Sequence, residues 1–307
     1  MKVLITADWH IRGERPLCRL DDDWIDSQRR TIQEIRGIFK KYAFDQMWIL
    51  GDLFDAPRCS TEAVNMLIEE LLKFPKDSVK VLCGNHDLKD HNYDNLSMCS
   101  IGTIKQLFDD IPDEVQGNIC RLTVSARPFG MDDCESKVSV ICTHQLTFPD
   151  DETRGIFGGS TAGELLAKWP SADLIFTGDY HHGYVHEELK DNLIWRYVVT
   201  PGCINIQKAD ELDYEPFVVM WDTEADLGHY VFKKFYLDPQ RDMCTRDHIE
   251  AREQKDAMLS EVVETIAGGD DITLDFDSNL EIKVRKSGDA IIDEYDVMRQ
   301  NMNEESK

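Results

Sequence analysis

Short apolar runs rich in β-branched residues recur along the chain and predict buried strands. Helical periodicity occupies the stretches between the first three runs, and this alternation of strand and helix favours a layered α/β architecture. The runs are residues 3–6, 47–50, 79–83, 139–143, 174–177, 197–200 and 217–221.

Three amphipathic helices are expected to cover the strands. A Thr161-x-x-Glu164 capping box announces the third of them, leading into Leu165, Leu166 and Trp169. We therefore expect an α/β fold in which mixed β-sheets are sandwiched by helices. The apolar faces of the first two helices are formed by Ile25, Ile32, Ile35, Phe39 and Tyr42, and by Ala63, Met66, Leu67, Leu71 and Phe74.

The pattern changes near residue 236, which predicts one large domain over 1–236 and a small α+β appendage over 237–307. The appendage begins with a polar helix over 246–266, in which Met258, Val262 and Ile266 form an apolar stripe. Two alternating runs, 272–276 and 280–285, then predict a hairpin. The stripe could pack on the large domain or on a partner.

Composition places the chain among soluble enzymes, with 42% hydrophobic and 30% charged residues. No run approaches the ~20 apolar residues of a membrane helix. The apolar N-terminal stretch is too short for a signal peptide. Nine cysteines without a C-x-x-C pair argue against a disulfide framework and a thiolate zinc site. We expect a cytoplasmic protein with reduced thiols and no membrane partner.

Polar residues that can bind metal follow five of the predicted strands. Loops at the carboxyl ends of strands in α/β sheets converge on one crevice, so residues distant in sequence become neighbours. Such a gathering of carboxylates would repel itself unless cations lay among them. The residues are Asp8 and His10, Asp52 and Asp55, Asn85, His86 and Asp87, His144, and Asp179 and His181.

The donor types narrow the metal. Imidazole, carboxylate and amide oxygen without thiolate suit manganese, magnesium, iron or zinc in a catalytic role better than a closed structural site. Seven donors exceed one coordination shell that must also admit water and substrate, which predicts two ions ~3.5–4 Å apart. Asp52 is the candidate bridge between them.

Each of these motifs alone is an ordinary turn signal, but their order along the chain resembles the five motifs of the calcineurin-like metallophosphoesterases. Within that superfamily, the segment Gly51-Asp52-Leu53-Phe54-Asp55 after Trp48-Ile49-Leu50 resembles most closely the SbcD-type nucleases of DNA double-strand-break repair and their bacteriophage counterparts. The resemblance covers residues 1–202. The other motifs that carry it are Asp8-Trp9-His10, Gly84-Asn85-His86-Asp87, His144 and Gly178-Asp179-Tyr180-His181.

The resemblance implies a ligand set for each ion. One ion would bind Asp8, His10, Asp52 and His181, and the other Asp52, Asn85, His144 and Asp179. Asp179 departs from the family, which usually has histidine at this place. A carboxylate makes the site harder and more anionic, and this favours manganese or magnesium over zinc.

The expected reaction follows from the charge of the substrate. A phosphodiester is a poor electrophile, and two cations would neutralise its oxygens and activate a water that attacks phosphorus. His86, beside Asn85 but not itself a ligand, would protonate the leaving oxygen. By resemblance, Asp55 would orient and charge His86.

The sequence does not decide which phosphoester is the substrate. The net charge of −25 does not fit a protein that grips DNA through a basic face. Loop cations at the crevice rim are the candidate DNA contacts, namely Arg12, Arg15, Arg19 and Lys89, together with His182. The leading interpretation is a DNA exonuclease and endonuclease subunit. A phosphatase, a cyclic-nucleotide phosphodiesterase and a catalytically weakened scaffold stay open as alternatives.

The resemblance also implies protein partners. SbcD-type nucleases act with an SbcC-type coiled-coil ATPase that binds near the C-terminus, and they commonly dimerise through helices beside the site. The apolar stripe on the predicted helix over 246–266 is the candidate dock for the ATPase.

Overall fold

The computed structural model describes residues 1–117, 121–130, 138–190, 194–224 and 232–267, with side chains up to residue 260. Met1–Cys244 forms one compact unit and Thr245–Lys307 a second. In the second unit the structure describes helix α6 (Asp247–Ala267). The predicted hairpin, and the side chains of the apolar stripe after Met258, lie outside the described residues. Within the described part of the chain, no helix is both long enough and apolar enough to cross a membrane.

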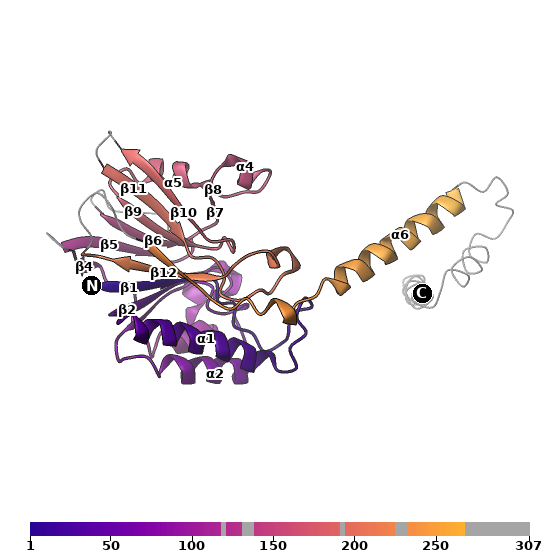
Figure 1. Cartoon of the computed structure of the whole chain (residues 1–307), viewed down its shortest axis with the longest axis horizontal. Coiled ribbons are helices and arrows are strands. Elements are labelled where there is room, and N and C mark those ends of the chain that lie inside the picture. The colour runs from indigo at the N-terminus through magenta and orange to yellow at the C-terminus, as the bar shows by residue number, and fades with distance from the viewer. Residues whose placement is uncertain (118–120, 131–137, 191–193, 225–231, 268–307) are drawn as a thin grey trace. The chain divides into compact units, whose positions relative to one another are not determined.

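The first unit contains two mixed sheets that face each other (Figure 1). The first sheet has the order β13-β12-β1-β2-β3, in which β1, β2 and β3 run parallel and β12 is antiparallel to both its neighbours. Its strands are β1 (Lys2–Thr6), β2 (Gln46–Leu50), β3 (Val79–Leu82), β12 (Phe217–Asp222) and β13 (Phe232–Tyr236).

The second sheet has the order β10-β11-β9-β6-β5-β4. Four central strands are parallel, and the two edge strands pair antiparallel to them. Its strands are β4 (Glu114–Gln116), β5 (Arg121–Arg127), β6 (Val140–His144), β9 (Leu174–Gly178), β10 (Tyr184–Lys190) and β11 (Ile194–Thr200). A separate short pair is formed by β7 (Thr147–Phe148) and β8 (Ser160–Thr161).

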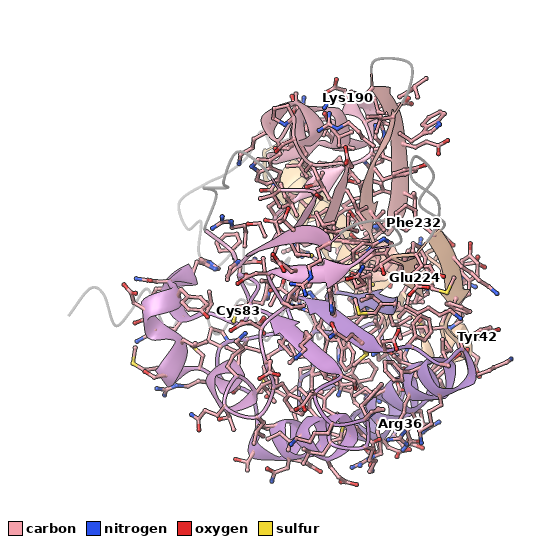
Figure 2. All side chains as sticks on the ribbon, turned by 90° about the vertical axis from the view of Figure 1, so that its left-hand side faces the viewer. Arg36, Tyr42, Cys83, Lys190, Glu224 and Phe232 are labelled. Carbon is pink, nitrogen blue, oxygen red and sulfur yellow. The ribbon has the colours of Figure 1, made fainter. Side chains whose placement is uncertain are left out.

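Helices cover the outer faces of both sheets. Helices α1 (Trp24–Lys41) and α2 (Thr61–Leu71) pack on the first sheet, and α5 (Ala162–Lys168) packs on the second. Figure 2 accordingly shows Arg36 of α1 and Lys190 of β10 on opposite sides of the unit. The other helical segments are α3 (Ser100–Ile104), α4 (Asp151–Arg154) and the short turns η1 (Lys89–His91), η2 (Tyr93–Met98), η3 (Ala209–Glu211) and η4 (Arg241–Met243).

Alternation along the strands divides the core into layers. In the first sheet Leu4 and Ile49 face the helices, whereas Ile5 and Trp48 face the second sheet. The central strands are thus buried on both faces, which explains their continuous apolar runs. The predicted α/β fold with mixed sheets flanked by helices is confirmed.

Local signals set the helix starts. The predicted capping box begins α5, because the Glu164 N–H donates to Thr161 Oγ1 at 3.2 Å and the Thr161 N–H donates to Glu164 Oε2 at 2.9 Å. Asp23 caps α1 and Ser60 caps α2 through their side-chain oxygens. These caps set the residues at which the three helices begin, after loops that carry the polar motifs.

A buried carboxylate ties α1 to α2. Glu70 of α2 is fully buried, and its oxygens lie 2.7 Å from Arg36 Nη1, 2.8 Å from Lys73 Nζ and 3.3 Å from Arg29 Nη1. Burial alone would raise the pKa of Glu70, but the bonds from Lys73, Gln33 and Arg36 lower it below its ordinary value. The ionised form is therefore the one that stabilises the fold.

Substitution of Glu70 by glutamine should lower the free energy of unfolding by about 1–3 kcal/mol at pH 7, because charged hydrogen bonds are lost. The stabilisation is complete above the unfolded-state pKa of about 4.3 and disappears as pH falls through the lower folded-state pKa. Urea unfolding of wild type and variant should therefore differ at pH 7 and converge once the pH falls below the folded-state pKa of Glu70. Glu69→Gln is the control, since Glu69 binds Lys73 and Arg29 from an exposed position. An undiminished difference at low pH would contradict this role.

Candidate metal centre

The residues singled out by the motifs meet where strands of both sheets end. The first sheet provides residues that follow its three parallel strands, and the second sheet provides residues at the ends of β6 and β9. From the first sheet come Asp8, His10, Asp52, Asp55, Asn85 and His86, and from the second come His144, Asp179 and His181.

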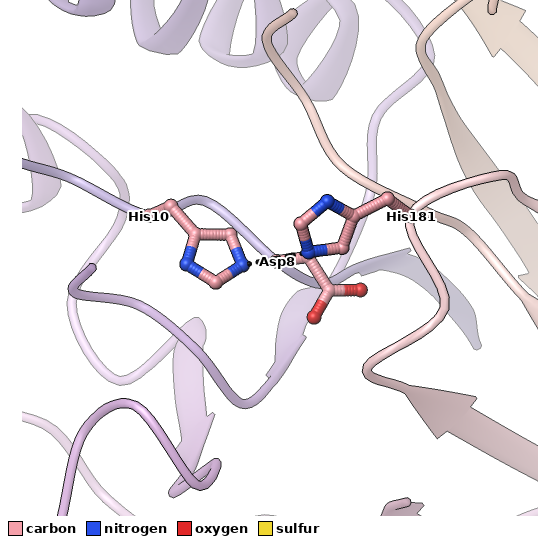
Figure 3. Close-up of side chains that lie close together, drawn as sticks. All are labelled: Asp8, His10 and His181. Carbon is pink, nitrogen blue, oxygen red and sulfur yellow. Dashed lines mark hydrogen bonds between the residues drawn. The ribbon is translucent and has the colours of Figure 1, made fainter. Parts of the chain in front are cut away.

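One group of donors is formed by Asp8, His10 and His181, whose ligand atoms all lie within 4.8 Å of one another. Figure 3 shows the two imidazole rings facing each other beside the Asp8 carboxylate. The two Nε2 atoms are 3.0 Å apart. Two ring nitrogens and a carboxylate oxygen directed at one point match the donor set of a divalent metal ion.

A second group is formed by Asp8, Asp52 and His144, again within 4.8 Å. His144 Nε2 lies 3.3 Å from Asp52 Oδ2 and 3.0 Å from Asn85 Oδ1. Its other nitrogen, Nδ1, donates to the Leu50 carbonyl at 2.7 Å, which turns Nε2 toward the carboxylates. Nε2 is therefore the atom of His144 that would bind a metal ion.

Asp52, a member of the second group, also approaches the first. Its Oδ2 is 3.3 Å from His144 Nε2 and 3.7 Å from His10 Nε2, so one oxygen faces ring nitrogens of both. The other oxygen, Oδ1, accepts the backbone N–H of His86 at 2.9 Å. An oxygen in this position could bridge two cations, and Asp8, which belongs to both groups, could do the same.

A further argument for a metal ion comes from donor atoms that lack hydrogen-bond partners. Among the described residues, Asp52 Oδ2 and His10 Nδ1 are buried without any hydrogen-bond partner. Such atoms are rare because desolvation of an unpaired polar group costs about 1–3 kcal/mol. A cation near Asp52 Oδ2 would satisfy that oxygen, and the other donors around it are ligand types.

Electrostatics points the same way. Burial alone would lower the pKa of His144, but the Asp52 carboxylate outweighs it and raises the pKa to about 10. Burial raises the pKa of Asp8 to about 6. The crevice thus favours positive charge at its centre and disfavours further negative charge.

Four of the candidate donor residues have left-handed backbone conformations, which residues other than glycine rarely adopt. The φ angles are 51° at Asp8, 44° at His10, 49° at Asp52 and 80° at Asp179. Each such residue costs on the order of 1–3 kcal/mol, and strain of this kind concentrates at functional sites. The contacts of the surrounding fold offset this strain and hold the four side chains in place.

Asp87 fixes the loops that carry two of the motifs. Its fully buried carboxylate accepts the backbone N–H groups of Gly84 at 2.9 Å, Phe54 at 2.9 Å and Leu53 at 3.3 Å. A Cβ on Gly84 would lie 2.2 Å from Asp52 Oδ1, so glycine is required there. Asp87 is part of the motif in the sequence, but its pattern gave no indication of this positioning role.

His86 is held beside the donors by its backbone and one ring nitrogen. Nδ1 lies 2.8 Å from the Asp55 backbone carbonyl, which can only accept, so Nδ1 donates and Nε2 is left free. The ring packs edge-on against His10 with centroids 4.9 Å apart. The orienting contact expected from Asp55 is made by its backbone, while its carboxylate lies 3.1 Å from Arg12 Nη1.

Asp179 is placed differently from the other predicted ligands. Its backbone N–H donates to Asp8 Oδ1 at 3.0 Å, and its carboxylate helps to raise the pKa of His144. Among the described residues, however, it belongs to neither close donor group.

Glu211 is a site residue that the sequence patterns did not reveal. Its Oε1 lies 2.5 Å from His181 Nδ1, and its Oε2 accepts the backbone N–H groups of Gln207 at 2.8 Å and Lys208 at 3.0 Å. Burial alone would raise the pKa of Glu211, but the bond from His181 lowers it. Nothing in the local sequence separates Glu211 from Asp210 or Asp213.

The side chains proposed to contact substrate differ in whether they are exposed or already bound within the protein. The Arg12 guanidinium lies against Asp55, and Arg15 Nη1 donates to the Asp21 carbonyl at 2.8 Å. Lys89 is exposed on η1. The suggestion that Arg19 meets DNA phosphate is wrong, because Arg19 is 3% exposed and grips both Asp21 carboxylate oxygens.

Comparison with known families identifies the fold. The family profile of calcineurin-like phosphoesterases matches residues 1–183, the stretch that contains every donor from Asp8 to His181. The chain belongs to the calcineurin-like phosphoesterases. That family implies divalent metal ions, and the donor groups of this calcineurin-like phosphoesterase are their candidate ligands.

Three solved structures that resemble the chain are distant from it in sequence. A dimetal phosphatase from Danio rerio is 12% identical with a TM-score of 0.49, over 76% of this chain and 95% of that one. A metallophosphoesterase from Sphaerobacter thermophilus is 14% identical with a TM-score of 0.36, over 78% and 90%. The Escherichia coli phosphoesterase Yfce is 15% identical with a TM-score of 0.35, over 78% and 100%. No curated protein matches the chain.

Proposed function

We propose that this phosphoesterase hydrolyses phosphodiester bonds in DNA with two divalent metal ions. The observation that carries the proposal is the pair of donor groups, one at His10 and His181 and the other at Asp52 and His144, which share Asp8. Bound there, two cations would neutralise phosphate oxygens and lower the pKa of a water molecule. The carboxylate of Asp179 and the amide of Asn85 favour manganese.

The protein's own groups supply the remaining chemistry. His86 has a free Nε2, because Nδ1 is bound to the Asp55 carbonyl, so Nε2 can carry the proton that the leaving oxygen requires. The sugar alkoxide of a DNA strand is a poor leaving group and depends on such a proton. His86 therefore supports a substrate with an alkoxide leaving group, as DNA has.

The DNA substrate rests on the resemblance of residues 48–55 to SbcD-type nucleases. By the same resemblance the protein would be the nuclease subunit of a repair or recombination complex, in bacteria or in phage infection. Its proposed partners are DNA, an SbcC-type ATPase bound through the C-terminal unit, and a second copy of the chain. In α6, Met258 is 46% exposed and available for such contact.

A phosphatase is the second candidate, because the net charge of −25 opposes attraction of a long polyanion. Purified protein with manganese, tested on linear duplex DNA, single-stranded DNA, a chromogenic phosphodiester and a chromogenic monoester, separates the candidates. We expect DNA hydrolysis that EDTA and Asp52→Asn both abolish. Hydrolysis of the monoester alone would replace the proposal with a phosphatase, and no hydrolysis at all would leave a scaffold.

A further inference from the structure

A connected row of aromatic rings leads away from the metal donors. Tyr180 stands in the chain between Asp179 and His181, and its ring centroid is 5.0 Å from that of Phe148. Phe148 in turn packs on Phe157 at 6.4 Å, with ring planes only 20° apart. The proposed reaction does not use any of these three rings.

The row ends in solvent. Phe148 is buried at 4% exposure, whereas Phe157 is 66% exposed. Phe157 lies nearly parallel to Phe148, and its large exposed fraction leaves the ring accessible to a flat ligand. Gly155 at φ 53° and Gly159 at φ 104° bracket this loop, and a Cβ on Gly159 would lie 2.7 Å from the Leu146 carbonyl. The glycines hold the turn that presents the ring.

A single exposed apolar side chain on a protein surface needs no explanation. Phe157 differs because a buried ring supports it from behind and Tyr180 connects that ring to the segment carrying two metal donors. His182 extends the same cluster, 5.7 Å from Tyr180. Aromatic side chains on the segments that form a polar site are typical of a ligand-binding region.

The side chains around the row are mainly acidic and do not favour electrostatic binding of phosphate. Helix α4, which precedes Phe157, carries Asp151 and Glu152. Its basic residue, Arg154, is paired with Asp151 and, at 2.8 Å, with Glu164. Affinity for a nucleic acid at this place must come from uncharged contacts, and every base offers a flat face for stacking on an aromatic ring.

We propose that Phe157, supported by Phe148 and continued by Tyr180, is a stacking shelf for the unpaired bases of a single-stranded DNA segment. The inference rests on the proposed DNA hydrolysis, and it narrows the substrate. Base faces are covered inside a duplex, so the shelf selects single strands or frayed ends. The metal centre would then bind the phosphates, so a protein of net charge −25 would not need a basic surface to bind DNA.

The test compares manganese-loaded wild type and Phe157→Ala on two single-stranded oligonucleotides, one of thymidines and one with abasic sites beside the cleaved bond. Stacking on one ring corresponds to about 5- to 150-fold in KM. The variant should raise KM for the thymidine strand by that factor and erase the advantage of thymidine over abasic DNA. Phe157→Trp should keep the advantage. Ile156→Ala is the control, since Ile156 is the exposed neighbour in the same loop without a ring.

A second readout does not depend on cleavage. A 2-aminopurine base in the strand loses fluorescence when it stacks, and we expect wild type but not Phe157→Ala to quench it. Cleavage with an unchanged preference for thymidine in Phe157→Ala would overturn the shelf. Quenching that requires Phe157 without any cleavage would support the shelf and refute DNA hydrolysis. Loss of self-association in Phe157→Ala, with DNA kinetics unchanged, would assign the rings to a protein contact and overturn the inference.

Discussion

Replacement of His86 by alanine is expected to lower kcat on DNA by about 10²–10⁴-fold, the usual contribution of a general acid. The reason is that Nε2 of His86, left free by the bond from Nδ1 to the Asp55 carbonyl, would no longer supply a proton to the leaving oxygen. Metal content measured on the purified variant should match that of wild type, because His86 belongs to neither of the two donor groups that contain Asp8 and instead forms a separate close group with His10 and Asp55.

The leaving group distinguishes proton donation from a structural effect. A p-nitrophenolate leaves without a proton, so the same variant should lose far less activity on a p-nitrophenyl diester than on DNA. His186→Ala, a histidine of β10, is the matched control and should behave as wild type. Equal losses on both esters, or a variant that has lost its metal, would contradict the assignment.

Substitution of Glu211 by glutamine is expected to weaken metal binding by about 10–100-fold, as loss of the partner of a metal-binding histidine usually does. Glu211 Oε1 lies 2.5 Å from His181 Nδ1, which fixes the ring and would make Nε2 a stronger ligand for a metal ion held together with His10 and Asp8. Isothermal titration calorimetry with manganese measures the change directly.

Thermal unfolding separates this positioning role from a purely structural one. In EDTA, Glu211→Gln should unfold within a few degrees of wild type, and only the rise in Tm on adding manganese should shrink. The control is Glu215→Gln, an exposed glutamate of the same segment whose carboxylate approaches Arg241 only at 4.0 Å. A low Tm in EDTA with unchanged metal affinity would rule the positioning role out.

The strands buried on both faces were predictable because their apolar runs are continuous. β2 and β9, for example, coincide with predicted runs within one residue at each end. Periodicity also located α1, α2 and α5, since each buries one face on a sheet. In these elements the local pattern and the tertiary environment agree.

The strands that sequence patterns missed lie at or beside sheet edges. β10 (Tyr184–Lys190) has polar residues at most positions, and β13 has two adjacent lysines in the middle of its five residues. An edge strand gains its place from backbone pairing with a neighbour, such as β10 with β11, and needs few apolar side chains. That information resides in the partner strand and is invisible locally.

The site divides in the same way. Residues directly after parallel strands could be predicted to converge, because the sheet fixes where the strand ends lie. Glu211 and Asp87 act through backbone and side-chain contacts across loops, and their residue types alone indicate none of this. Arg19 shows the opposite error, since its salt bridge with Asp21 withdraws a plausible loop cation from the surface.

The origin of the donors in two separate sheets gives the core between the sheets an indirect influence on catalysis. Trp221 of the first sheet packs on Phe176 of the second with centroids 5.3 Å apart, and Trp48 adds a ring at 5.6 Å from Trp221. These rings act as a spacer that sets how far apart the sheets stand. Donors on opposite sheets, such as His10 and His181, keep their 3.0 Å separation only while that spacer keeps its thickness.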